Sequence, residues 1–280
     1  MMRISRPIAL IAPAAALIGV FLIVPYLNII VVSLRAPAQS TPYGVGFSTQ
    51  SYVRFFSDSY YLTALAQTLW LGALTTIVCL VLGFPVALQI ARSTARWRAV
   101  LYGLILSPLL IGIVVRSFGW TILLGNNGVI NRGLREMGVI RAPLPLMYNS
   151  FGVVVALAHV FLPFMILPIL SALQLVDPAL QNAARSLGAS RLTVFRRIVL
   201  PLALPGVQSG VILVFVLAVS AYVTPMLVGG MRVKTMAIIV VDTLLDQFQW
   251  PLGSALALML SVATGAAVLV FISLTRVRWK

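Results

Sequence analysis

The sequence predicts an all-α membrane protein with about six transmembrane helices. Hydrophobic residues fill 61% of the 280 positions and charged residues only 9%, whereas a soluble domain carries about 25% charged residues. Six stretches contain no Asp, Glu, Lys or Arg: residues 7–34, 59–91, 99–115, 142–176, 198–231 and 247–275. Five of these stretches exceed the roughly 20 residues that a helix needs to cross a bilayer. Their apolar character is continuous, which favours helices over the alternating strands of a transmembrane barrel.

The expected membrane-spanning helices, in chain order, are residues 8–34, 61–91, 99–123, 150–173, 204–228 and 252–275. The first is longer than the apolar region of a cleavable signal peptide, so we expect an uncleaved anchor. Its Pro13 and Pro25 are tolerated in a membrane helix when neighbouring groups satisfy the freed carbonyls. The third is interrupted by Arg116 but stays apolar as far as Leu124. Together the six helices predict a single transmembrane domain over residues 1–280.

The segments between these helices are expected to be mostly short. Residues 36–56 are rich in Pro, Gly and Ser and predict irregular structure. Residues 125–150 predict a turn, a short amphipathic helix and a proline-rich return, with Val129, Leu134 and Met137 on one face of that helix. Residues 229–251 have a helical pattern in their middle, which is expected to lie at the membrane interface or to re-enter between spans.

The net charge of +15 is explained by membrane topology rather than by nucleic acid. With six spans and a cytoplasmic N-terminus, the C-terminus is also cytoplasmic, and the cytoplasmic side carries a large excess of cations over one acid, Asp177. The cytoplasmic cations are then Arg3, Arg6, Arg92, Arg96, Arg98, Arg185, Arg191, Arg196, Arg197, Arg276, Arg278 and Lys280. This excess follows the positive-inside rule, so we expect both termini in the cytoplasm and no nucleic-acid partner.

Few residues carry chemistry of the kind that enzymes use. Cys79 is the only cysteine and His159 the only histidine, so neither a disulfide nor a metal-binding cluster is expected. Because His159 lies inside the fourth apolar stretch, it is a functional candidate. The competing interpretation is a neutral histidine that is hydrogen-bonded to another helix.

The polar segment between the fourth and fifth apolar stretches, NAARSLGASRLTVFRRIVLP over residues 182–201, has strong local signals. Asp177 followed by Pro178 predicts the start of a helix. Gly188 can adopt the left-handed conformation that ends it, and Ser190 is placed to cap a second helix. Leu192, Phe195 and Val199 then recur at a helical spacing and form one apolar face.

Two interpretations of this segment remain open on its residues alone. One is an amphipathic helix at the membrane surface, whose arginines only satisfy membrane topology. The other is a docking surface for a soluble protein. Ala183, Ala184 and Gly188 leave a surface of low relief that another protein can approach closely, and charge placement does not explain them.

The segment resembles the EAA loop of the permease subunits of binding-protein-dependent ABC importers. The resemblance rests on Ala183-Ala184, Gly188, Ile198 and Leu200-Pro201 at the family's spacing. The chain departs from the pattern at Asn182, where the family usually has glutamate. The stretches HVFLPFMILPILSALQLVDPAL, AYVTPMLVGG and WPLGSAL resemble the spermidine/putrescine-type branch.

This resemblance implies a type I importer permease fold in a bacterial inner membrane. It also implies a second permease subunit, most simply in a heterodimer, two cytoplasmic ATPase subunits and an external solute-binding protein. Residues 178–201 would be the coupling loop, with the ATPase-coupling set Asn182, Ala183, Ala184, Arg185, Gly188, Ile198, Leu200 and Pro201. Because the chain has no GxxxxGK[ST] phosphate-binding loop, ATP and Mg²⁺ are expected in the ATPase. We expect no cofactor in this chain and no enzymatic activity.

The substrate signals are weaker. Asp242 and Asp246 lie four residues apart and share one face of a helix. With the aromatic faces of Tyr222 and Trp250 they could attract a polyamine. The presence of Asp242 and Asp246 would also be explained if they pair with neighbouring cations or cap a helix. Arg116 could instead suit a carboxylate, or extend its head group to the interface.

Other solutes and other protein classes stay open at this point. An opine-like amino-acid derivative is the next candidate substrate, and iron, sulfate or thiamine follow. A secondary transporter or channel is the alternative class, although the charge-free spans lack the intramembrane acids on which such proteins often depend. Only one histidine is available for a catalytic set, which argues against a membrane enzyme.

Overall fold

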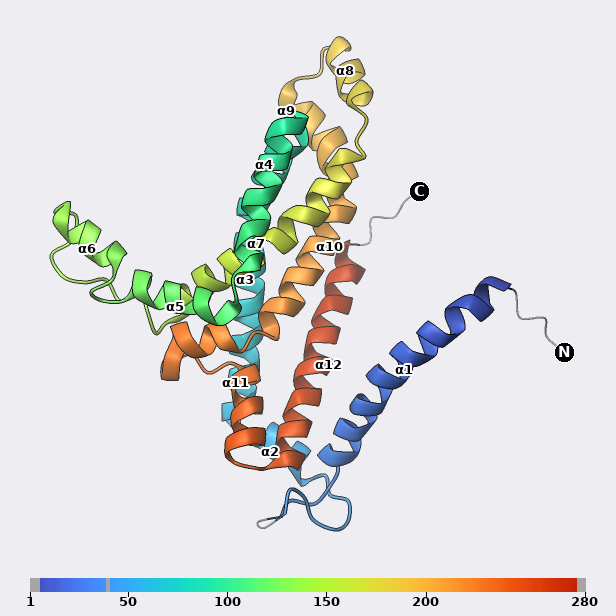
Figure 1. Cartoon of the computed structure of the whole chain (residues 1–280), viewed down its shortest axis with the longest axis vertical. Coiled ribbons are helices and arrows are strands. Elements are labelled where there is room, and N and C mark those ends of the chain that lie inside the picture. The colour runs from blue at the N-terminus through green and yellow to red at the C-terminus, as the bar shows by residue number, and fades with distance from the viewer. Residues whose placement is uncertain (1–5, 39–40, 276–280) are drawn as a thin grey trace. The chain divides into compact units, whose positions relative to one another are not determined.

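The structure of the protein, a computed structural model, describes residues 6–38 and 41–275 (Figure 1). In these ranges the regular structure is helical apart from one isolated bridge between Arg35 and Phe47, so the all-α prediction is confirmed. The α-helices are α1 (Arg6–Ser33), α2 (Gln50–Ser57), α3 (Ser59–Arg92), α4 (Ala95–Leu106), α5 (Ile113–Leu124), α6 (Val129–Glu136), α7 (Ser150–Gln174), α8 (Pro178–Ser186), α9 (Arg191–Val194), α10 (Leu200–Val219), α11 (Met236–Val241) and α12 (Trp250–Thr275).

The chain divides into two compact units. One contains residues 1–63 and 239–263, and the other contains residues 64–238 and 264–280. Helices α1 and α2 belong to the first unit and α4 to α10 to the second, while α3, α11 and α12 contribute to both. Arg3 and the three C-terminal cations named above lie outside the described residues.

The expectation of about six transmembrane helices is confirmed. Within the described ranges, five helices are long and apolar enough to cross a membrane, and a sixth is counted if one bent pair forms a single span. The most exposed of them is α1, in which Phe21 is 74% exposed. The exposed apolar surface of α1 must be covered by lipid or by a partner subunit.

The expected third helix, residues 99–123, is wrong as a single straight element. Helix α4 ends at Leu106, a 3-10 turn covers Ser107–Leu110, and α5 begins at Ile113 after a bend of 94°. Pro108 explains the break, because it lacks an N–H and its ring clashes with the preceding turn. Arg116 then donates a hydrogen bond from Nη2 to the carbonyl oxygen of Ile111 at 3.1 Å. That bond satisfies a backbone group at the break.

The expected fifth helix, residues 204–228, is also wrong in its boundaries. Helix α10 starts at Leu200 and ends at Val219, and a π-turn covers Pro225–Gly229. Residues 220–222 are not helical, and Pro225 lies in the first turn of the helical run that follows, where its missing N–H is tolerated. The chain therefore leaves the helix several residues sooner than its hydropathy indicates.

The core of the second unit is the packing of α7 against α10 (Figure 1). Most of α7 is buried, and Met165 and Ile169 are completely shielded from solvent. On the facing side of α10, a Cβ at Gly206 would lie 2.5 Å from the carbonyl oxygen of Pro168, and one at Gly210 would lie 2.9 Å from the sulfur of Met165. The two glycines form a GxxxG pattern, which lets membrane helices approach closely.

The loop after α5 has the predicted turn, short helix and return. Its short helix is α6, but Val129 and Met137 are 62% and 70% exposed, so they do not form an inward face. The buried residue is Asn131. Its amide nitrogen donates to the carbonyl oxygens of Gly125 and Leu144, and its oxygen accepts from the Leu144 N–H at 2.8 Å. One side chain thus closes the loop.

The first unit is held together locally near the ends of its helices. Tyr52 of α2 shares a 2.7 Å hydrogen bond with Ser33 at the end of α1. Arg54 of α2 donates to the side-chain oxygen of Gln249 at 3.3 Å. Residues 229–251 contain α11 and a π-turn over Asp242–Asp246, which agrees with the helical pattern predicted for the middle of this segment.

Candidate functional site

The segment between α7 and α10 has the helix caps that its sequence predicts. Asp177 accepts a hydrogen bond from the Ala179 N–H at 2.8 Å and caps α8. Gly188 adopts φ +86°, which is the left-handed conformation expected after the helix. Ser190 accepts from the Thr193 N–H at 3.2 Å and caps α9. The predicted helix, glycine turn and second helix are therefore confirmed.

The second helix does not stand apart from the following span. Helix α9 covers one turn, and a π-turn over Phe195–Val199 carries it directly into α10. The buried residues are Val194 and Val199, five residues apart, which is the spacing that i→i+5 bonds bring together. The predicted inward face is wrong at Leu192, which is 62% exposed. Phe195 packs edge-on against Phe84 of α3, with their rings 5.8 Å apart.

The residues of the EAA-like pattern divide into an exposed group and an anchoring group. Asn182, Ala183, Arg185 and Gly188 are exposed, whereas Ala184 is half-buried and packs against the core of the second unit. Ile198 also packs against that core, Leu200 is half-buried and Pro201 is exposed at the start of α10. The exposed group offers a surface to a partner, and the anchoring group attaches that surface to the membrane helices.

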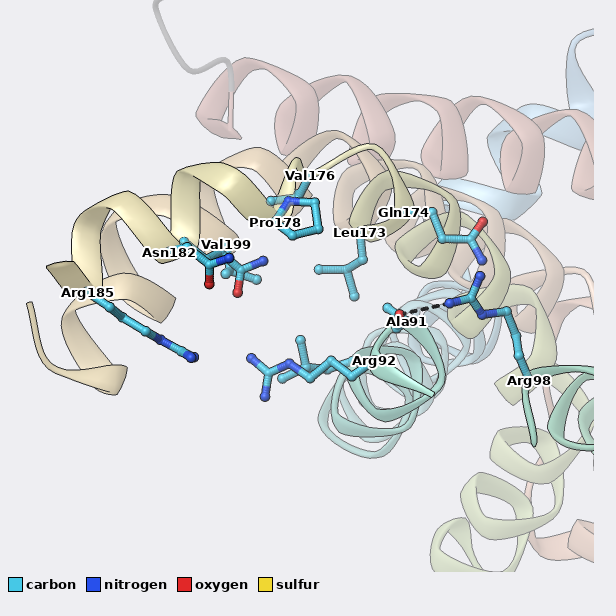
Figure 2. Close-up of a pocket in the computed structure, with 12 residues that line it drawn as sticks. Ala91, Arg92, Arg98, Leu173, Gln174, Val176, Pro178, Asn182, Arg185 and Val199 are labelled. Atoms are coloured by element: carbon cyan, nitrogen blue, oxygen red, sulfur yellow. Dashed lines mark hydrogen bonds between the residues drawn. The ribbon is translucent and has the colours of Figure 1, made fainter. Parts of the chain in front are cut away.

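Helix α8 also forms one wall of a pocket of about 610 Å³ (Figure 2). The other walls are the end of α3, the start of α4, the end of α7 and Val199. Three arginines line the pocket, one each from α3, α4 and α8: Arg92, Arg98 and Arg185. No aspartate or glutamate is found among the described residues that line it.

The residues predicted for the translocation path belong to two units. Arg116 and Tyr222 lie in the second unit, and both are half-buried. Asp242, Asp246 and Trp250 lie in the first, where the two acids occupy one π-turn and Trp250 begins α12. Of these three, Asp246 and Trp250 are exposed.

Two structural details bear on the ionisable groups of the membrane helices. Trp120 of α5 donates to Nδ1 of His159 at 3.3 Å. His159 is thus hydrogen-bonded to another helix, as one of its two interpretations expects. The Nε and Nη1 atoms of Arg116 are shielded from solvent, and among the described residues they have no hydrogen-bond partner.

Sequence comparison identifies relatives along most of the chain. Residues 144–277 match the family described as "binding-protein-dependent transport system inner membrane component". The spermidine/putrescine transport system permease protein PotB of Haemophilus influenzae is 31% identical over 255 residues, covering 90% of this chain and 87% of that protein. PotB of Escherichia coli K12 is 32% identical over 251 residues, covering 90% and 91%.

Comparison with solved structures shows the same architecture. A chain of a bacterial ABC transporter that imports the acidic polysaccharide alginate has a TM-score of 0.77, with 19% identity over 97% of this chain and 95% of that chain. A chain of an amino acid ABC transporter has a TM-score of 0.54, with 19% identity over 82% of this chain and 98% of that chain. The fold is therefore that of ABC importer permeases.

These comparisons decide between the protein classes that the sequence left open. A secondary transporter or channel is not supported, because the matching family and proteins are described as inner membrane or permease components of transport systems. The extent and identity of the PotB matches exceed what a shared fold alone would give. The chain is thus a multi-pass membrane protein that belongs to the family of inner membrane components of binding-protein-dependent transport systems.

Proposed function

We propose that this chain is the permease subunit of an ATP-driven importer for a polyamine such as spermidine or putrescine, and that α8 couples it to a cytoplasmic ATPase. The observation that carries the coupling proposal is an exposed helix with formed caps at both ends, joined by a short segment to α7 and through α9 and the π-turn to α10. The names of the PotB relatives support the polyamine. In this proposal residues 1–280 act as one transmembrane domain and residues 178–201 are its coupling loop.

The local geometry of α8 suits the transmission of force. Its cap at Asp177 and the left-handed turn at Gly188 limit fraying at both ends. Ala184 and Ile198 anchor it to the core that α7 and α10 form. When a partner moves the helix, the displacement therefore passes to these two membrane helices instead of being lost in a loose loop.

The proposal needs partners for both the energy and the solute. Two ATPase subunits would bind ATP and Mg²⁺, a second permease would complete the path, and a solute-binding protein would deliver the substrate. One structural neighbour is a bacterial alginate ABC transporter in complex with a periplasmic protein that is bound to an alginate pentasaccharide. The arginines within α8 and after it support a cytoplasmic position for this loop and for both termini.

Ala183→Arg tests the coupling assignment. Ala183 is exposed on α8, so a long charged side chain there should hold a docked protein away without disturbing the core. Co-purification of the ATPase should fall about tenfold or more. That decrease corresponds to a loss of about 1.4 kcal/mol or more of binding free energy. Ala142→Arg places the same side chain at an exposed alanine of another loop and should leave co-purification unchanged. Normal recovery of the ATPase with Ala183→Arg would contradict docking through α8.

Replacing both Asp242 and Asp246 with asparagine tests the polyamine assignment. The change removes two negative charges from one turn, so the KM for spermidine uptake should rise about threefold to tenfold, given up to about 1 kcal/mol per exposed ion pair. The measurement is uptake into vesicles that contain the assembled importer, with ATPase recovery as the control. Unchanged uptake kinetics would exclude these acids from the path.

A carboxylate-bearing amine, such as an opine-like solute, is the second candidate substrate. The observation that favours it is Arg116, a half-buried cation whose Nε and Nη1 have no hydrogen-bond partner among the described residues, because a guanidinium group is a strong partner for a carboxylate. Ligand-stimulated ATP hydrolysis in nanodiscs separates the candidates. Stimulation by spermidine alone supports the polyamine, whereas stimulation by the opine-like solute, lost in Arg116→Gln, supports the alternative.

A further inference from the structure

The three arginines of the pocket beside α8 are held there by different means. Arg98 donates from Nη2 to the carbonyl oxygens of Ala91 and Ser93 at 3.2 and 3.1 Å, and so caps the end of α3. Its Nε is shielded from solvent and has no partner among the described residues. These bonds hold the charge of Arg98 at one wall of the pocket, because both acceptors are backbone atoms.

The other two arginines are exposed and approach from opposite walls. Figure 2 shows Arg185 of α8 and Arg92 of α3 extending toward one another into the space between the two helices. Asn182, three residues before Arg185 on α8, also lines the pocket and carries no charge. The described lining therefore has three positive charges and no negative one.

The repulsion among these three positive charges is weak while the pocket is open to water. Like charges in one cavity repel each other, and bulk water and dissolved anions screen that repulsion. When another protein covers the pocket, the arginines lose this water, and the cost of desolvation is recovered only if the new neighbour supplies negative charge. A protein surface that covers this pocket must therefore carry negative charge at that place.

We propose that this pocket receives one or more carboxylates from the docking surface of the ATPase, an inference that rests on the proposed coupling role of α8. Four of the lining residues belong to α8 itself: Pro178, Gln181, Asn182 and Arg185. A protein seated on this helix covers the pocket at the same time. A guanidinium group pairs with a carboxylate through two parallel hydrogen bonds, so the contact also sets the orientation of α8 on its partner.

The test measures ATPase affinity for the permease complex in nanodiscs of phosphatidylcholine and, in parallel, in nanodiscs that also contain phosphatidylglycerol. In the double variant Arg92→Gln/Arg185→Gln, affinity at low salt should fall about tenfold or more, because two charge pairs are lost. The original complex should weaken as salt rises from about 0.01 to about 0.5 M, and the double variant should respond less. Arg132→Gln/Arg141→Gln removes two exposed arginines elsewhere and should change neither value.

The outcomes separate this inference from the proposed function. If Ala183→Arg prevents ATPase binding while the double variant binds normally, the carboxylate contact is wrong and coupling through α8 stands. If both bind normally, coupling through α8 is wrong as well. If the double variant is defective only in nanodiscs that contain phosphatidylglycerol, the pocket holds a lipid head group and the inference is overturned. Equal melting temperatures of the variants confirm that the fold is intact.

Discussion

Replacing Gly188 with proline is expected to abolish uptake while the chain still inserts into the membrane. Gly188 has φ +86°, whereas the proline ring holds φ near −65°. The substitution also removes the N–H that donates to the carbonyl oxygen of Arg185 at 2.9 Å. The turn after α8 cannot form, so the helix loses its end and the following Ala189–Ser190 segment changes direction.

The expected defect is in the turn after α8 and not in the folding of the chain, because Gly188 does not pack in the core. A Cβ at position 188 would meet no atom within 4 Å, so the side chain itself causes no clash and only backbone geometry is at stake. The measurements are substrate uptake and ATPase co-purification in reconstituted vesicles, normalised to the amount of permease in the membrane. Both should fall to background.

Two milder substitutions at Gly188 serve as matched controls. Gly188→Asn should retain most of the uptake, because asparagine tolerates the left-handed conformation. Gly188→Ala should be intermediate, at a cost of about 1–2 kcal/mol for a left-handed L-residue. If the proline, alanine and asparagine variants all transport at the rate of the original protein, the conformation of this turn is not needed for transport.

Gly206→Leu is expected to have the largest effect on stability. A Cβ at this position would lie 2.5 Å from the Pro168 carbonyl oxygen and 2.6 Å from the Ala172 Cβ. The Pro168 contact is with backbone, so α10 and α7 must move apart for a larger residue to fit. We expect a loss of about 3 kcal/mol or more, at the upper end of the range for overpacking, with little protein recovered in the membrane.

Gly265→Leu is the matched control for this prediction. Gly265 is also a helical glycine, in α12, but a Cβ there would meet no atom within 4 Å. The thermal stability of the purified chain and its yield from membranes should be normal with Gly265→Leu and strongly reduced with Gly206→Leu. Gly206→Ala should lie between them. A fully stable Gly206→Leu variant would contradict the tight packing of α7 against α10.

Local features of this chain were predictable because their causes are local. A continuous apolar stretch predicts a membrane helix from its length, and the caps at Asp177, Gly188 and Ser190 depend on contacts within a few residues. The GxxxG pattern of Gly206 and Gly210 can also be read from the sequence. The surface that packs against these two glycines could not be predicted, because the spacing of the pattern does not indicate that Pro168 and Met165 face it.

Helix boundaries were less predictable where proline competes with hydropathy. The stretches around Pro108 and Pro225 are free of charge, yet the helix breaks at Pro108 and shortly before Pro225. Hydropathy indicates whether side chains prefer lipid or water. It does not indicate whether the backbone hydrogen bonds of a helix continue through a proline. A proline inside a membrane helix can be absorbed, as at Pro163 and Pro168 in α7, so its presence alone did not decide between a kink and a break.

By itself, the sequence determined that the chain lies in lipid, that its spans are helical and that a capped helix stands between α7 and α10. Only the tertiary structure decided which residues of that segment face outward, that Asn131 closes a loop by reaching Leu144, and that Arg92, Arg98 and Arg185 share one pocket. The physical reason is range. Caps and hydropathy act between near neighbours, whereas a charge in a pocket depends on residues that meet only after the helices have packed.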